Sequence, residues 1–346
     1  MADIGTPTTD ASLTGLMVRL QTGVPGGSPG LLGLLLLLVA GFSVAVPGFA
    51  STGTLQSFMQ QLPLLGLLSL AMLMPLITGG LNLAIIATTN QCALLMVFVM
   101  RTLLPADPGG LTVVGVILLA MLAGIALCLV IGLLTGALVA YTGVHPILVT
   151  LGTKSLIDGI SIFLTRGQAQ SGLPEAFARV GNAALGGVPV GFLVLIACGL
   201  LMGLVLRRTP FGISCAMIGS NIEATRYSAI DTRRVLVGVY TLSSLMCFVA
   251  ALVSLAIFNS ASADYAQSYL LVTILAAVLG GVDPFGGFGK VSGLMIALAI
   301  LQVISSGFNQ FGVSPYLTAA IWGLVLIAVM TVQTIRPYLG AFGRPR

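Results

Sequence analysis

The feature that most constrains this chain is a series of apolar runs, each close to the length of a membrane span, that begins near Leu31 and continues almost to the carboxyl end. A helix needs about 20 apolar residues to cross the roughly 30 Å of hydrocarbon in a bilayer. The composition agrees, since 57% of the residues are hydrophobic and only 7% are charged, whereas soluble domains average about 45–50% and about 25%. The sequence therefore predicts an all-α polytopic membrane protein.

About ten transmembrane helices are expected from a scan with a window of span length. Residues 56–100 form one apolar stretch interrupted by TGGLN at Thr78–Asn82, and the eighth span is short and ends in glycines. Interrupted segments are tolerated at membrane depth where they are buried in protein or line a cavity, so these are expected to be broken or re-entrant and to mark a transport route. The expected spans are 31–49, 56–78, 81–100, 112–141, 146–164, 188–206, 235–257, 268–282, 291–309 and 315–334.

The basic residues indicate the orientation, because cytoplasmic loops of membrane proteins carry an excess of Lys and Arg. With the amino terminus inside, only Arg101, Arg166 and Arg179 lie outside, and Lys154 lies within a span. We therefore expect both termini to be cytoplasmic. The basic residues placed inside are Arg19, Arg207, Arg208, Arg226, Arg233, Arg234, Lys290, Arg336, Arg344 and Arg346.

One membrane domain, residues 31–335, is expected between a mobile cytoplasmic tail (1–30) and a second cytoplasmic tail (336–346). GVHPIL at Gly143–Leu148 precedes the fifth span and GVSPYL at Gly312–Leu317 precedes the tenth. A five-helix inverted repeat predicts this offset. A second pair, GGLN and GGVD, does not share it, so the predicted repeat is weak.

The glycine-rich stretch LGGVDPFGGFGKVSG, Leu279–Gly293, raises the question of a nucleotide site. A P-loop requires G-x-x-x-x-G-K-[ST], so that backbone N–H groups cradle phosphate and a hydroxyl reaches magnesium. Here the first glycine position holds Pro284, which has no N–H, and the hydroxyl position holds Val291. We therefore expect no nucleotide at this stretch. Its glycines are expected to allow close helix packing and a sharp cytoplasmic turn.

Other common ligands are also disfavoured. The single histidine, His145, lacks the neighbours that a metal site needs, and the five cysteines occur singly, so they are interpreted as small apolar packing residues. The basic residues are dispersed and form no aromatic-interleaved face, which argues against nucleic acid.

One long cytoplasmic loop, residues 207–234, separates the sixth and seventh spans. Asn221 is expected to cap a short helix through Glu223, Ala224 and Arg226, with turn chemistry at Asp231. A short helix held between two membrane helices would move as they move. The alternative is a solvated loop whose arginines only fix the orientation of the chain.

Several sequence blocks together resemble the permease subunits of ribose-type, carbohydrate-family ATP-binding-cassette (ABC) importers, the inner-membrane component of binding-protein-dependent transport systems. The blocks occur in the expected order over most of the chain, and the amino-terminal tail lies outside them. They are ITGGLNLA (Ile77–Ala84), HPILVTLGTKSLIDGISIFLTRG (His145–Gly167), TPFG (Thr209–Gly212), IGSNIEATRYSAID (Ile218–Asp231), LGGVDPFGGFGKVSG and SGFNQFGVSPYL (Ser306–Leu317).

This resemblance implies a ten-helix permease in the bacterial inner membrane that imports a sugar or sugar-like small solute by alternating access. It implies a second permease copy or paralogue, cytoplasmic ATPase subunits that bind ATP and magnesium, and a periplasmic substrate-binding protein. The chain itself would then hold no cofactor and catalyse no reaction. By analogy, the coupling helix that contacts the ATPase comprises Ser220, Asn221, Glu223, Ala224, Arg226 and Asp231.

Neutral polar residues inside spans are the candidates for the translocation pathway, because polyols and sugars need hydroxyl and amide partners. Phe308 and Tyr265, near the outer ends of their spans, are candidates for an outer gate, and interfacial anchoring is the alternative. For each polar residue the alternative is an interhelical hydrogen bond. The pathway candidates are Asn82, Thr88, Asn90, Gln91, Thr150, Lys154, Asp158, Ser305 and Asn309.

Two departures from the family pattern concern this route. Family members commonly have G-G-I-D-L-S before the third helix, whereas this chain has an amide at Asn82 and an alanine at Ala84. Lys154 and Asp158, one helical turn apart, place charge inside a span, where charge is costly and normally paired. They are interpreted either as a pair that neutralises itself or as residues that line the cavity.

The sequence gives less support to two other classes of function. An ion-coupled secondary transporter of a small polar solute would need intramembrane carboxylates, and Asp158 is the clearest of the few present. An intramembrane enzyme would need a catalytic constellation such as Ser-His or paired carboxylates, which the sequence lacks.

Overall fold

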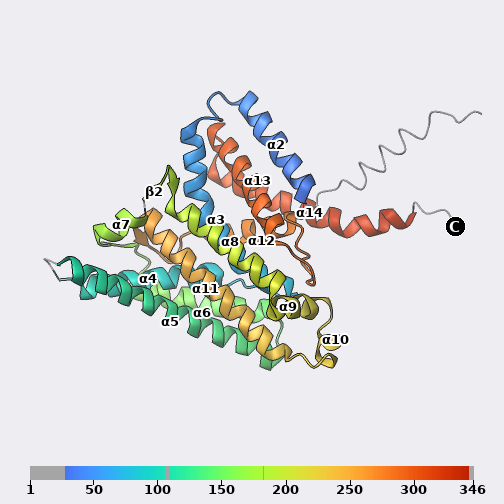
Figure 1. The fold of residues 1–346 in the computed structure, drawn as a ribbon, viewed down its shortest axis with the longest axis horizontal. Coiled ribbons are helices and arrows are strands. Elements are labelled where there is room, and N and C mark those ends of the chain that lie inside the picture. The colour runs from blue at the N-terminus through green and yellow to red at the C-terminus, as the bar shows by residue number, and fades with distance from the viewer. Residues whose placement is uncertain (1–27, 106–108, 182, 343–346) are drawn as a thin grey trace, which may run out of the picture.

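The computed structural model of the protein describes residues 28–342, apart from 106–108 and 182, and most of this part is helical (Figure 1). Two short antiparallel ribbons pair β1 (Gln170–Ser171) with β4 (Ser260–Ala261) and β2 (Ala184–Leu185) with β3 (Val188–Pro189). The helices are α2 (Ser28–Ala45), α3 (Thr52–Ile77), α4 (Ile85–Leu103), α5 (Gly110–Thr142), α6 (Pro146–Thr165), α7 (Glu175–Gly181), α8 (Val190–Arg208), α9 (Pro210–Ser220), α10 (Ile222–Tyr227), α11 (Thr232–Phe258), α12 (Tyr269–Leu279), α13 (Val291–Gln310) and α14 (Pro315–Phe342).

Each of the ten predicted spans corresponds to one of these helices within a few residues, except that α14 continues to Phe342. Seven helices are long and apolar enough to cross a membrane: α3, α4, α5, α6, α8, α11 and α13. The other three contain shorter apolar stretches, Pro29–Ala45, Tyr269–Leu279 and Tyr316–Ala328. The all-α polytopic fold is thus confirmed, while the number of crossings and the inverted repeat stay predictions.

The predicted tails are only partly within the described residues. Positions 1–27 of the amino-terminal tail lie outside them, and α2 begins at Ser28. At the other end, α14 projects beyond the rest of the bundle (Figure 1) and remains helical past residue 336.

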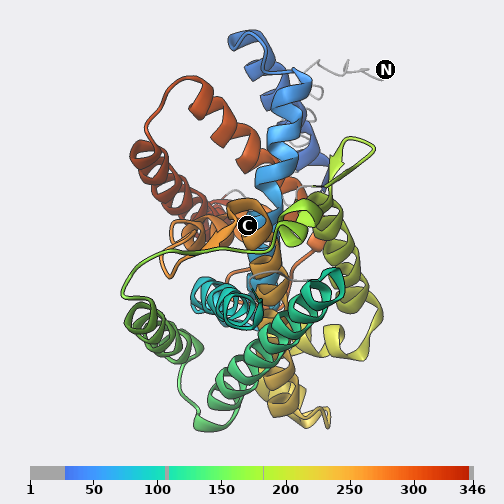
Figure 2. The same cartoon turned by 90° about the vertical axis from the view of Figure 1, so that its left-hand side faces the viewer.

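Helix α3 forms the centre of the bundle, because its residues from Leu62 to Ile77 are all buried. Ser51 caps its first turn by accepting a hydrogen bond from the Thr54 amide. The core around α3 also takes side chains from α8, α11, α12 and α13. A second apolar cluster joins α4, α5 and α11, and Figure 2 looks nearly along α4 with α5 and α6 on its flanks.

The outer helices leave most of their apolar side chains uncovered. On α5, α6 and α8 only about one residue in five of the span is buried within the chain, and Leu118, Phe163 and Leu200 are among the exposed residues. Lipid is as apolar as these side chains, so a membrane helix needs no protein cover. These helices therefore present the surfaces available to lipid or to another subunit.

The five cysteines are free and buried, as expected for packing residues. Cys215 of α9 lies in the loop between the sixth and seventh spans. Burial raises the pKa of the Cys215 thiol to about 12, so this thiol stays protonated and unreactive at neutral pH.

Candidate functional site

The loop of residues 207–234 is mostly helical and joins α8 to α11 at one end of the molecule, which we call the α10 end (Figure 1). Thr209 begins α9 by accepting a hydrogen bond from the Gly212 amide at 3.2 Å, with Pro210 in the first helical position. Asn221 ends α9 and begins α10, where its Oδ1 accepts from the Ala224 amide at 3.0 Å. The predicted cap and short helix are therefore confirmed, and α9 is an additional helix that the loop interpretation missed.

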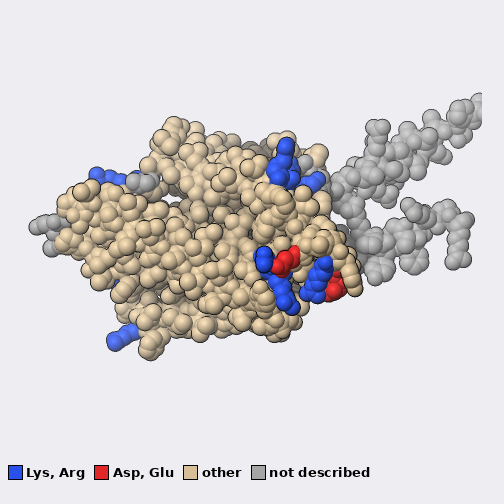
Figure 3. Space-filling view, turned by 60° about the horizontal axis from the view of Figure 1, so that its bottom comes forward, with Lys and Arg blue, Asp and Glu red and all other residues tan. Residues whose placement is uncertain are grey.

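Helix α10 is anchored on one face and exposed on the other. Thr225 is buried, and the Arg226 Nε donates to the Thr232 hydroxyl of α11 at 3.4 Å. Glu223 and Arg226 form an ion pair of 2.7 Å on the exposed face, and Asp231 caps α11 through the Arg234 amide at 3.2 Å. Charged side chains gather at this end of the molecule (Figure 3).

Tyr227, the last residue of α10, is 91% exposed. A surface groove of about 480 Å³ lies between α8, α9 and α10, lined by Leu206, Ile213, Met217 and Ala224 among others. Aromatic side chains beside apolar pockets are typical anchors of protein–protein interfaces. The sequence predicted the charged residues of α10 as contact residues but did not include Tyr227. A tyrosine at the end of a short polar helix is nevertheless a recognisable sign of a contact surface.

The interruption between α3 and α4 is held by polar side chains from two other helices. The Asn82 amide donates to the Ser243 hydroxyl of α11 at 2.9 Å, and its Oδ1 accepts from the Ala84 backbone. Thr150 of α6 donates to the Leu81 carbonyl at 3.0 Å. Side-chain hydrogen bonds thus satisfy part of this non-helical backbone, which is the condition for irregular backbone at membrane depth.

Asn90 and Gln91 of α4 also make bonds within the chain. The Asn90 amide donates to the carbonyls of Ala263 and Tyr265, at 2.8 and 2.9 Å, and so fixes the segment between β4 and α12 to α4. Ser161 of α6 donates a hydrogen bond to Gln91. Thr88, also on α4, is buried.

Lys154 and Asp158 form an ion pair of 2.7 Å between Nζ and Oδ2 on α6. Their side chains are 23% and 19% exposed, and the second carboxylate oxygen of Asp158 has no hydrogen-bond partner in the described part of the chain. The pair predicted from the sequence is confirmed. The pair lies on the same side of α6 as the buried Thr150, Ile157 and Ser161, and about a fifth of each charged side chain is exposed.

On α13, Ser305 is half-buried and Asn309 is exposed, so the structure leaves both free for contacts outside the chain. The two predicted gate residues belong to separate aromatic contacts. The Phe308 ring lies 6.4 Å from that of Trp322, while the Tyr265 ring lies 5.2 Å from that of Phe258. The outer gate stays a prediction.

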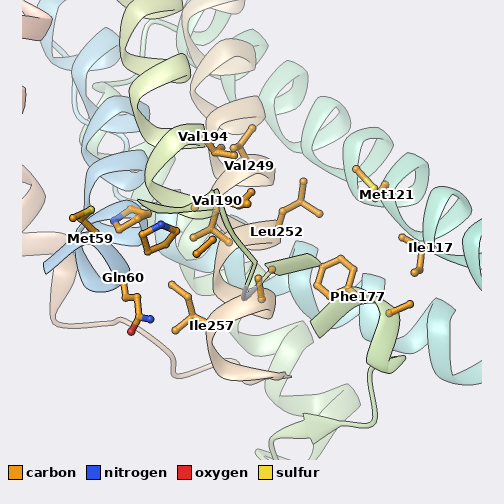
Figure 4. Close-up of a pocket in the computed structure, with 18 of the residues that line it drawn as sticks. Met59, Gln60, Ile117, Met121, Phe177, Val190, Val194, Val249, Leu252 and Ile257 are labelled. Atoms are coloured by element: carbon orange, nitrogen blue, oxygen red, sulfur yellow. The ribbon is translucent and has the colours of Figure 1, made fainter. Parts of the chain in front are cut away.

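A cavity of about 550 Å³ lies between α3, α5, α7, α8 and α11 (Figure 4). Its lining is apolar apart from Gln60, and none of the predicted pathway residues takes part. A hydrophilic solute needs hydrogen-bonding partners along its route. This cavity is therefore unsuited to such a cargo. No group of three or more ligating side chains capable of holding a metal occurs within residues 28–342 as described.

Within the described residues, seven apolar helices of membrane-spanning length, a broken helix pair stabilised by buried amides and an exposed charged helix at one end indicate a multi-pass membrane transport component. A family model described as the permease component of a branched-chain amino acid transport system matches residues 54–330. The chain belongs to this family, and it is the transmembrane permease of an ABC importer in the inner membrane.

Similar proteins include the autoinducer 2 import system permease protein LsrD from three organisms. The protein of Yersinia enterocolitica is 31% identical over 277 residues, which cover 78% of this chain and 80% of the relative. That of Photorhabdus temperata is 29% identical over 308 residues, 87% and 89% of the two chains. That of Yersinia pseudotuberculosis serotype O:3 is 30% identical over 277 residues, 78% and 80% of the two chains. No solved structure matches.

Proposed function

We propose that this permease imports a sugar-like small solute, released to it by a periplasmic binding protein, and that it works beside a second permease copy or a paralogue. Two observations support this cargo class. The permeases named above serve autoinducer 2 import systems, and the polar side chains buried in this chain are mainly amides and hydroxyls. The family description alone would favour a branched-chain amino acid, so an uptake assay must compare both classes.

The energy for transport is supplied, in this proposal, by separate ATPase subunits that bind ATP and magnesium and dock at α10. The observation that carries this assignment is the exposed face of α10, with Tyr227 and the Glu223–Arg226 pair beside a groove and a buried opposite face. Such a helix offers contact surface while remaining fixed to α9 and α11. If α10 contacts the ATPase, the α10 end and both termini lie in the cytoplasm. In this proposal ATP hydrolysis takes place on the ATPase.

The route for the solute is proposed to pass the partly exposed polar side chains of α6 and α13, which are Lys154, Asp158, Ser305 and Asn309. Asn82, Asn90, Gln91 and Thr150 are engaged within the chain in this conformation. Those four would reach a solute only after the helices move. Alternating access supplies such a movement, because ligands shift a transporter between existing states.

Uptake into proteoliposomes tests the proposed cargo. The permease, the ATPase and the binding protein are reconstituted with ATP inside, and labelled autoinducer 2, ribose and leucine are compared. Saturable uptake of autoinducer 2 or ribose, with leucine at background, is the expected result. Uptake of leucine alone would overturn the proposed cargo class and leave the family assignment intact.

A further inference from the structure

Three segments far apart in the sequence meet through glycines at the α10 end. They are the end of α3 (Ile77–Gly79), the last turn of α9 (Gly219–Ser220) and the turn between α12 and α13 (Phe285–Gly287). Figure 1 shows the loop between α12 and α13 reaching toward α9. We call this meeting point the glycine junction.

The contacts in the glycine junction are between backbones. The Gly287 amide donates a hydrogen bond of 2.8 Å to the Ile77 carbonyl. A Cβ atom added at Gly219 would lie 2.0 Å from that carbonyl oxygen and 2.3 Å from the Gly287 nitrogen. One added at Gly286 would lie 2.7 Å from the Gly79 nitrogen and 2.9 Å from the Gly219 Cα. Any side chain at Gly219 or Gly286 would therefore push the segments apart.

The backbone conformation at the junction also requires glycine. Gly79, Gly286 and Gly287 have φ angles of +79°, +97° and +90°, a region that residues with a Cβ rarely adopt. The glycines of LGGVDPFGGFGKVSG thus serve close approach, as predicted, and the partners are now identified as α3 and α9. Lys290 of this stretch lies 5.3 Å from the ring centre of Phe288.

The junction connects the proposed coupling helix to the polar interior. On one side, Gly219 is two residues from Asn221, the residue that begins α10. On the other side, Gly79 leads into the interruption between α3 and α4, where Leu81 and Asn82 bond to Thr150 of α6 and Ser243 of α11. A continuous path of backbone and hydrogen-bond contacts therefore runs from α10 to α6 and α11.

We propose that the glycine junction is a rigid connection that carries the displacement of α10 to the interruption between α3 and α4, so that α6 and α11 move when the ATPase moves α10. Backbone segments in direct contact, with no side chain between them, have no room to slide and shift as one unit. This inference deepens the proposed function and rests on it, since it takes α10 as the contact with the ATPase. Gly79, Gly219 and Gly286 are positioning residues in this scheme.

Substitution tests the connection. Gly219→Ala and Gly286→Ala are compared with two controls inside helices, where an added Cβ has no neighbour within 4 Å: Gly115→Ala in α5 and Gly41→Ala in α2. In the full reconstituted complex, both junction variants should keep ATPase binding and ATP hydrolysis. Solute imported per ATP should fall at least about fivefold, the lower end of usual coupling between sites, and the controls should match the wild type. Normal import per ATP in either assembled junction variant would overturn the proposal.

Hydrogen exchange on the unmodified complex covers the case in which these variants fail to fold. The Gly287 amide, bonded to Ile77, should exchange equally slowly without nucleotide and with a non-hydrolysable ATP analogue, because a rigid connection stays closed in both states. Faster exchange at Gly287 in one state would overturn the proposal. The failure of the proposed function has a different signature: α10 variants that import normally would remove the coupling role of α10, whatever the exchange at Gly287.

Discussion

The side-chain amide of Asn82 donates a hydrogen bond to the hydroxyl of Ser243, which lies 2.9 Å away on α11. Ser243 in turn donates to the Ala71 carbonyl of α3 at 2.7 Å. Since the hydroxyl proton is used on Ala71, Ser243 can only accept from residue 82. A carboxylate has no proton to donate, so the amide is the form that suits this position in this chain.

Asn82→Asp is therefore expected to destabilise the protein. The change removes the donor to Ser243 and places a carboxylate against a hydroxyl oxygen that cannot donate to it. Losing a buried hydrogen-bond partner costs about 1–3 kcal/mol, and more for a charged group, so the apparent melting temperature in detergent should fall. Asn259→Asp, at an exposed position after α11, is the control and should melt like the wild type. Equal melting of both variants would contradict the role of Asn82.

Asn90→Ala should loosen the segment between β4 and α12. The substitution leaves the carbonyls of Ala263 and Tyr265 without the amide that they now accept from. Hydrogen exchange of residues 260–268 should accelerate at least about tenfold, which corresponds to about 1.4 kcal/mol. Thr89→Ala is the control, because Thr89 is equally buried on α4 and its hydroxyl donates to Ile85 of its own helix, not to residues 260–268. Unchanged exchange in Asn90→Ala would show that the segment is held by other contacts.

Asp158→Ala should impair uptake while assembly with the ATPase stays intact, if the ion pair of α6 borders the route. A pair that only neutralises itself makes a different prediction, because removing both charges then removes the penalty of an unpaired charge. We expect the double variant Lys154→Ala/Asp158→Ala to remain impaired in proteoliposome uptake. Recovery of uptake in the double variant would assign the pair a purely structural role.

Tyr227→Ser should weaken the complex with the ATPase without unfolding the permease, since the ring is exposed. Truncating an interface anchor of this kind costs about 2 kcal/mol or more of binding free energy, which raises the Kd about 30-fold. Titration of detergent-purified permease with the ATPase measures the change. Tyr316→Ser, an exposed tyrosine at the start of α14, is the control and should bind like the wild type. Wild-type affinity in Tyr227→Ser would argue against docking at α10.

The hydrophobic pattern was sufficient to predict the helices, because each span must satisfy its own backbone within the bilayer. The cap at Asn221 and the ion pair of Lys154 with Asp158 were also predictable, since both depend on residues at most four positions apart. Helix α9 was predictable for the same reason, because Thr209 followed by Pro210 is a common pair of residues at the start of a helix.

Contacts between distant segments could not be predicted in this way. The sequence shows Asn90 as a polar residue in a span, but its partners Ala263 and Tyr265 become apparent only when the chain folds back. The glycine-rich stretch was correctly assigned to close approach, yet nothing near it in sequence indicated Gly79 or Gly219 as its neighbours.

The most direct test of the account is the energy source for uptake in proteoliposomes that contain the permease, the ATPase and the binding protein. We predict that solute accumulates only when ATP and the binding protein are both present, and that collapsing the proton and sodium gradients leaves the rate unchanged. Accumulation that follows an ion gradient in the absence of ATP would contradict the account.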